Sequence, residues 1–132
     1  MRRILGMALL LCGAAFAGEL KLPDSPVGKR FAKFVEVFNA GERAGFVAFH
    51  KETASDAEAS QRADQDVGAA KQTGGLKLHS VTKSDETYIS VLAQTKSSGE
   101  WIQFEFEVAK EAPHDVTNIG VRPASAPKDA AK

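Results

Sequence analysis

The chain has 132 residues, enough for a single domain that buries most of its apolar surface without disulfides or metals. Its 17 Lys and Arg side chains balance 17 Asp and Glu side chains, and no run of like charge occurs. This balance gives no support to nucleic acid or an anionic membrane surface as a partner.

Residues 1–17 have the pattern of a secretory signal peptide. Arg2 and Arg3 form a positive start, residues 4–14 form an apolar run, and an A-x-A site ends at Ala17. The apolar run is too short for a membrane-spanning helix. We therefore expect cleavage after Ala17 and a secreted or periplasmic protein, with no membrane association after the signal is removed.

The sole cysteine, Cys12, lies inside the apolar run and leaves one alternative open. A lipoprotein would begin at Cys12, but such sites resemble one another in having a small residue before the cysteine, and Leu11 stands there. Cleavage after Ala17 is the favoured reading. It removes the cysteine and with it any disulfide or thiolate chemistry.

Residues 25–41 predict a helix that is buried along one side. Ser25 can cap its first turn, Pro26 suits the first helical position, and Gly41 suits the left-handed end. Its large apolar side chains recur at i, i+4, i+7, i+8 and i+11, the spacing of one helix face. They are Val27, Phe31, Phe34, Val35 and Phe38.

Two more polar helices are expected after the first. Residues 42–52 predict a short one, although Gly45 weakens it. The sequence S-x-x-E at Ser55 to Glu58 is a capping box and predicts the start of a third helix, which ends at Gly74 and Gly75.

From Leu76 the apolar period changes from 3.6 to 2, which predicts strands. The links between the alternating segments are short and rich in turn residues, so neighbouring strands should be antiparallel. Helices followed by such a meander predict an α+β fold, with the N-terminal helices packed on a curved four-stranded antiparallel sheet. The predicted strands are 76–79, 87–93, 101–108 and 116–122.

Alternation also predicts which strand residues face the helices, and all of these are apolar. We expect one cone-like domain over 18–123 and a disordered tail over 124–132, which has no apolar anchor. The predicted inward residues are Leu76, Leu78, Ile89, Val91, Ala93, Ile102, Phe104, Phe106, Val108, Ile119 and Val121.

Several short motifs in order resemble a known group of domains: F-N-A-G-E, T-G-G, G-E-W and P-H-x-V-x-x-I-G-V-R-P. The chain over 23–123 resembles the nuclear-transport-factor-2-like, or cystatin-like, α+β cone superfamily. It looks like the members that precede a secreted bacterial serine hydrolase or tail-specific protease. The sequence stops at Lys132 and has no G-x-S-x-G or H-E-x-x-H, so the resemblance implies only the fold and an accessory, free-standing binding role.

The cone superfamily also includes isomerases and cyclases, which use an inward acid or base. Here Glu105 and the only tyrosine, Tyr88, alternate to the outer face. We therefore expect no catalytic residue, and keep an isomerase- or cyclase-like enzyme as a less favoured alternative. A bulge in a strand would reverse this assignment.

The histidines and acidic residues do not have the spacing of a metal or cofactor site. We expect His50 to complement the C-terminal dipole of its helix, His79 to be solvated, and His114 to bond local backbone. The carboxylates of the third helix, Asp56, Glu58, Asp64 and Asp66, are expected on a solvated face.

Two binding hypotheses remain, and both concern the sheet. Its outer face would carry a group of polar and aromatic side chains, which suits either a solvated sheet back or a contact surface for a homodimer or protein partner. This group comprises Tyr88, Trp101, Gln103, Glu105 and Arg122.

The alternative is a pocket for a small apolar ligand between the first helix and the sheet. Residues 57–71 contain little apolar area, so the third helix would leave a cavity there. The residues expected to line it are Phe31, Phe34, Phe38, Phe104 and Phe106.

Overall fold

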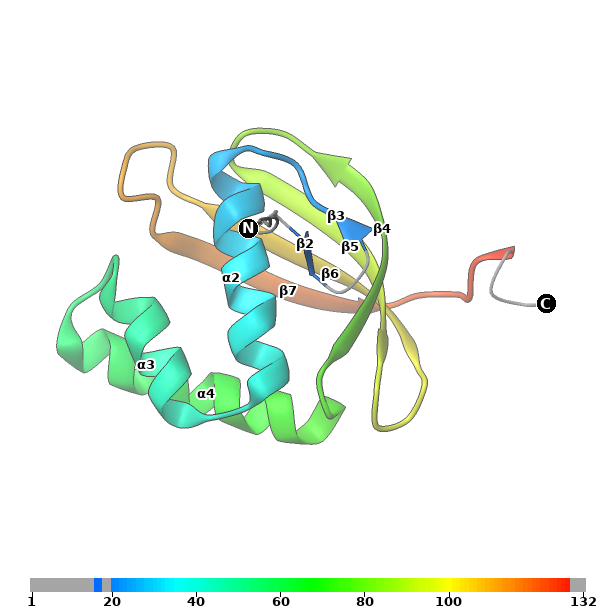
Figure 1. Ribbon diagram of the computed structural model, residues 1–132, viewed down its shortest axis with the longest axis horizontal. Helices are drawn as coiled ribbons and strands as arrows, with labels where there is room; N and C mark the ends of the chain where they lie inside the picture. Colours follow the sequence, from blue (N-terminus) through cyan, green and yellow to red (C-terminus); the bar gives the residue numbers. More distant parts are fainter. Residues whose placement is uncertain (1–15, 18–19, 129–132) are drawn as a thin grey trace, which may run out of the picture.

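A computed structural model describes residues 16–17 and 20–128 (Figure 1). Side chains are described from Leu20 onward. The predicted signal peptide therefore lies outside the described residues, apart from the backbone of 16–17. The last four residues of the predicted tail also lie outside them.

The first long helix, α2 (Pro26–Ala40), has the predicted ends. The Ser25 hydroxyl accepts a hydrogen bond from the Gly28 amide at 3.1 Å, and Pro26 occupies the first turn. Gly41 ends the helix at φ 75°, in the left-handed conformation that costs glycine little. The predicted stripe is buried as a whole. The sequence therefore determined this helix through its caps and its 3.6-residue period.

The other two described helices are α3 (Arg43–Lys51) and α4 (Asp56–Thr73). Ser55 caps α4 by accepting a bond from the Glu58 amide at 3.2 Å, and Gly74 ends it in the left-handed conformation. Helix α3 buries two phenylalanines, whereas α4 buries only alanines. These buried alanines are Ala59, Ala63 and Ala70.

The four-stranded antiparallel sheet has the order β4-β5-β6-β7, a meander (Figure 1). The prediction of an α+β fold with helices packed on this meander is confirmed. The first strand is longer than 76–79 because it continues through two irregularities in register, where the alternation of side chains breaks. The strands are β4 (Leu76–Ser84), β5 (Tyr88–Thr95), β6 (Trp101–Val108) and β7 (Val116–Pro123).

The core lies between α2 and one face of the sheet, and α3 and α4 close one end of it (Figure 1). The inward side chains of β5 and β6 are at most 8% exposed. One predicted inward residue differs: Val121 is 56% exposed. It is paired with Phe104 and so is on the helix side of the sheet, but the helices do not cover that part of β7.

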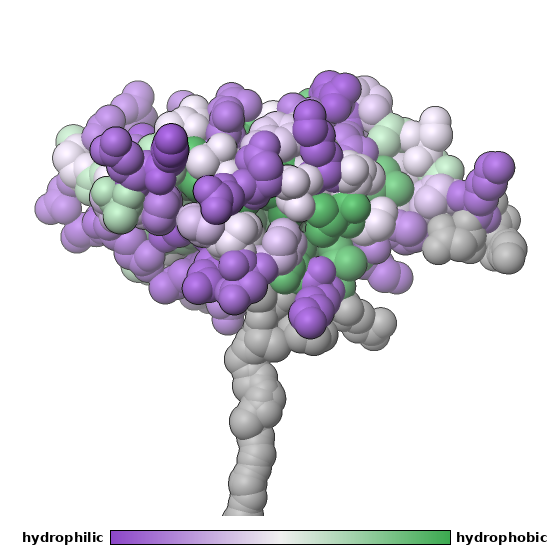
Figure 2. Space-filling view, turned by 90° about the horizontal axis from the view of Figure 1, so that it is seen from above, coloured by the Kyte–Doolittle hydropathy of each residue, from purple (hydrophilic) through white to green (hydrophobic). Residues whose placement is uncertain are grey.

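A second sheet pairs β2 (Phe16–Ala17) with β3 (Leu20–Lys21) near the start of the chain. Seen from above, the described surface is mainly hydrophilic, with a small hydrophobic area beside the atoms drawn in grey (Figure 2). In the part of the chain that the structure describes, no helix is long and apolar enough to cross a membrane.

Candidate functional site

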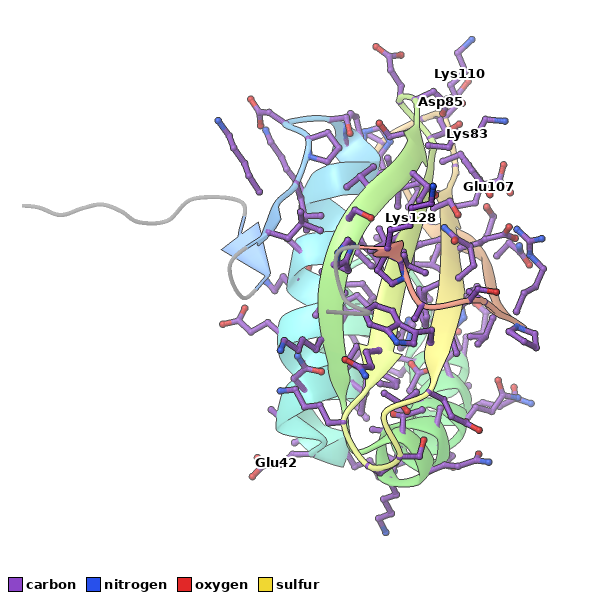
Figure 3. The ribbon with its side chains drawn as sticks, turned by 90° about the vertical axis from the view of Figure 1, so that its right-hand side faces the viewer. Glu42, Lys83, Asp85, Glu107, Lys110 and Lys128 are labelled. Atoms are coloured by element: carbon purple, nitrogen blue, oxygen red, sulfur yellow. The ribbon has the colours of Figure 1, made fainter. Side chains whose placement is uncertain are left out.

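The outer face of the sheet lies on the side opposite α2, where Glu107 also points (Figure 3). The residues of β6 alternate between buried and half-buried along its whole length, and the half-buried ones form the outer face. The predicted outer residues Trp101, Gln103 and Glu105 are the half-buried ones. Arg122 is the cross-strand partner of Gln103, so it belongs to the same face.

Gln103 connects three strands at the centre of the outer face. Its side-chain amide donates to Thr82 Oγ1 on β4 at 2.6 Å and to Ser90 Oγ on β5 at 2.7 Å. Ser90 is 4% exposed, so this hydroxyl is buried beneath its neighbours although it faces away from the helices. The amide therefore holds the middle of the outer face in one arrangement.

The other outer residues are held in pairs. Glu105 accepts from the Arg122 guanidinium at 2.6 Å, with the arginine side chain 65% exposed. Trp101 packs edge-to-face with His79, at 5.7 Å between ring centroids. At the opposite end of β6, Tyr88 lies under the Lys83 ammonium at 5.7 Å. The structure thus places all five predicted residues on one face, with the two aromatic side chains at different ends.

The five phenylalanines predicted to line a pocket lie in the core and contact one another. Phe31 is 5.4 Å from Phe106, and Phe34 is 5.3 Å from the same ring. Phe38 lies 6.5 Å from Phe104, and each of the five is at most 3% exposed. Three clefts on the described part of the chain, at the two ends of β7 and beside α4, are lined by other residues. The rings themselves fill the space between α2 and the sheet.

A separate cleft of about 470 Å³ opens between α4 and β7, and we refer to it as the α4–β7 cleft. Its lining combines polar side chains of α4 with residues of the edge strand and one residue of α3. The lining residues are His50, Arg62, Gln65, Asp66, Ala69, Val116, Thr117, Asn118 and Ile119.

His50 forms the inner wall of this cleft. Its residue is 1% exposed, and its Nε2 lies 2.6 Å from Asp66 Oδ2. The prediction that Asp66 is on a solvated face is wrong, because its side chain is 15% exposed and paired. His50 is in the last turn of α3, as predicted, but its burial and its partner were not anticipated.

The surroundings of His50 indicate its tautomer. In the described residues its Nδ1 is buried with no hydrogen-bond partner. A proton on Nδ1 would be a buried donor without an acceptor, which is costly. The neutral imidazole that carries its proton on Nε2 and donates to Asp66 fits the geometry best.

A second polar contact joins α4 to the start of β7. Arg62 donates to both carboxylate oxygens of Asp115, at 2.9 and 3.4 Å, and Thr53 donates to the same group at 2.8 Å. Burial raises the pKa of Asp115, but these hydrogen bonds lower it by more, so its pKa is below the ordinary value. The ionised pair therefore stabilises the fold at neutral pH, and this contribution is lost as the pH falls below about 4.

The remaining histidines are placed close to expectation. His114 Nδ1 contacts the carbonyl of Ala109 at 3.0 Å, which confirms a local backbone bond. His79 is half-buried rather than fully solvated, because it packs on Trp101. Among the described residues, no group of three or more His, Cys, Asp or Glu side chains could hold a metal ion.

A signal for the buried pair was present in the sequence. Phe46, Phe49 and His50 recur at i, i+3 and i+4, so His50 shares the apolar face of α3. Asp66 falls seven residues after Ala59, within the stripe of buried alanines on α4.

Comparisons of the chain with protein families, curated proteins and solved structures found no match.

Proposed function

We propose that this protein is an exported, non-catalytic binding domain that docks a protein partner on the outer face of its sheet. The observation that carries the proposal is the ordered outer face, where contacts between strands hold Gln103, Glu105 and Trp101 in place. Export follows from the signal-like sequence before Gly18.

An ordered surface reduces the entropy that is lost on binding. Each immobilised long side chain costs about 0.5–1.5 kcal/mol when a complex forms. Gln103 bonds two hydroxyl groups and Arg122 bonds Glu105, so part of that cost has already been met in the free protein. On a surface that binds no partner, the same contacts would give no such advantage.

The composition of the face also suits a protein partner. Tyrosine, tryptophan and arginine are enriched at the centres of protein interfaces. The face carries Trp101, Tyr88 and Arg122, together with charges of both signs at Lys83 and Glu105. Such a mixture favours a partner with complementary charges rather than a purely apolar ligand. The resemblance to accessory domains of secreted hydrolases supports the same role.

The proposal predicts that Trp101→Ala weakens partner binding at least tenfold, because a large aromatic contact is lost. A photo-crosslinking residue at position 107, on the same face, would first capture the partner from the cells that produce the protein (Figure 3). Calorimetry with the identified partner would then measure the affinity. The control is Lys33→Ala on α2, whose side chain is 54% exposed on the helix layer and should bind normally.

Two results would count against this docking surface. One is equal affinity of Trp101→Ala and the unmodified protein. The other is capture of the partner from a crosslinker at Lys33 and not from one at position 107.

A second candidate function is the binding of a small polar ligand in the α4–β7 cleft. The specific observation in its favour is a cleft of about 470 Å³ with the buried His50–Asp66 pair in its wall. The amides of Gln65 and Asn118 add donors and acceptors at its rim. This ligand would be more polar than the small apolar ligand that was expected in a phenylalanine-lined pocket.

A ligand that saturates the α4–β7 cleft should raise the melting temperature by about 5 °C or more. Small carboxylates, amines and sugars would be screened by thermal shift. Gln65→Trp would fill the cleft and remove the effect, whereas Gln61→Trp, on α4 but outside the cleft lining, should preserve it. A shift that survives Gln65→Trp would place the ligand elsewhere.

A further inference from the structure

Strand β7 is an edge of the sheet, and its outer backbone groups are turned away from β6. The Ala124 amide donates to the Trp101 carbonyl at 3.0 Å. In an antiparallel pair every second residue bonds the neighbouring strand. The backbone groups of Asn118, Gly120 and Arg122 therefore face β6, and those of Ile119 and Val121 face outward.

The two edges of the sheet differ in protection. On β4, two breaks in register and the side chains of Lys77 and Lys83 oppose pairing with another chain, and β3 lies beside it. On β7 the pairing with β6 is regular from Asn118 to Pro123. The β7 edge is thus the one suited to accept another strand.

The β7 edge is also open toward the helices. The α4–β7 cleft lies along its first half, and a second cleft of about 300 Å³ lies between Thr73 of α4 and Val121. Val121 is the exposed large hydrophobic side chain of the described residues, at 56%. An occupant of this edge would cover an apolar side chain that now meets water.

We infer that a second copy of this chain pairs its β7 antiparallel with β7 around a two-fold axis at Gly120. In this register Ile119 of one copy is opposite Val121 of the other, and both residues have outward backbone groups. Four backbone hydrogen bonds form across the axis. Each copy buries the exposed Val121 against an isoleucine, and the two meanders become one continuous sheet.

The side chains around the axis are complementary to themselves. Gly120 of one copy is opposite Gly120 of the other. This is a non-hydrogen-bonded pair, in which the Cα atoms are about 4.5 Å apart, and two glycines fit there because neither has a side chain. On the outer face, Asn118 is opposite Arg122, so an amide meets a guanidinium. Because the contact is isologous, each favourable pair occurs twice.

Other registers are less favourable. A shift by one residue would place Ile119 of one copy opposite Arg122 of the other. The backbone groups of Arg122 already bond β6, so the outward N–H and C=O of Ile119 would have no partner. Centring the axis on Val121 would place Pro123 opposite Ile119, and proline has no N–H to donate. Of these three registers, only the one centred on Gly120 pairs both the N–H and the C=O groups of Ile119 and Val121.

The first test is the oligomeric state of the purified protein by sedimentation velocity. The buried area of an edge contact is small, so we expect a reversible dimer at about 100 µM rather than a permanent one. Val121→Lys, at a position already exposed, should weaken the dimer at least tenfold while leaving the melting temperature unchanged. A protein that stays monomeric at about 1 mM would overturn the inference.

Engineered cysteines test the register in a Cys12→Ser background, which has no other cysteine. Gly120→Cys should form a disulfide-linked dimer, because a Cβ there has only ordinary contacts with Glu105, the nearest at 3.4 Å. Asn118→Cys and Arg122→Cys should each crosslink poorly alone and readily when mixed. Equal crosslinking of each single variant would contradict this register.

The edge contact and the outer-face docking can fail separately. A dimer that is lost in Trp101→Ala but kept in Val121→Lys would use the outer face and would overturn the β7 pairing. A dimer that is lost only in Val121→Lys supports the pairing, whatever the partner experiment shows.

Discussion

Replacing Phe34 by alanine is expected to lower the free energy of unfolding by about 3–5 kcal/mol. Phe34 is 1% exposed and contacts the rings of five other phenylalanines, at centroid distances from 5.3 to 6.3 Å. Its removal leaves a cavity where α2, α3 and β6 meet. A domain of this size has only about 5–15 kcal/mol of stability, so most of it would be lost.

Urea unfolding followed by the fluorescence of Trp101 would measure this effect. Phe34→Leu refills part of the space and should cost clearly less than alanine. Gln61→Ala, at an exposed position of α4, is the surface control and should change stability by less than about 0.5 kcal/mol. A loss below about 1.5 kcal/mol for Phe34→Ala would show that the rings repack, and would contradict a rigid core.

The second large effect is expected at the buried polar pair. Asp66→Ala removes the acceptor of the His50 Nε2 hydrogen and leaves both nitrogens of a 1% exposed imidazole without partners in the described structure. An unsatisfied buried donor costs about 1–3 kcal/mol. We expect a loss of about 2–3 kcal/mol, measured by urea unfolding at pH 7.

Asp66→Asn separates the hydrogen bond from the charge. Its side-chain oxygen can still accept from the neutral imidazole, so it should cost about 1 kcal/mol or less. If Asn and Ala destabilise the protein equally, His50 is held by the charge of Asp66, and the assigned tautomer is wrong.

The elements that the sequence predicted well are those with local causes. The caps at Ser25 and Gly41 and the phenylalanine stripe define α2 without reference to the rest of the chain. The alternation from Trp101 to Val108 defines β6 in the same way. Strand β4 was predicted too short because its later part departs from a two-residue period at the breaks in register.

The features that were missed depend on how the elements pack. His50 and Asp66 meet only because α3 lies against α4, and their separation of 16 residues carries no sign of this contact. The periodicity of each helix indicates burial but does not name the partner. Val121 was expected to be covered because alternation gives the side of a sheet, not the extent of the helices above it.

The weak apolar content of α4 has a consequence for the response of the domain to salt. Helix α4 buries only alanines and is joined to its neighbours by charged groups, including Arg43–Asp64, with side chains 50% and 67% exposed, and Arg62–Asp115. Ions in solution screen exposed pairs, but they do not weaken the phenylalanine core. We therefore expect rising ionic strength to loosen α4 in preference to α2, and the width of both clefts beside β7 to change with it.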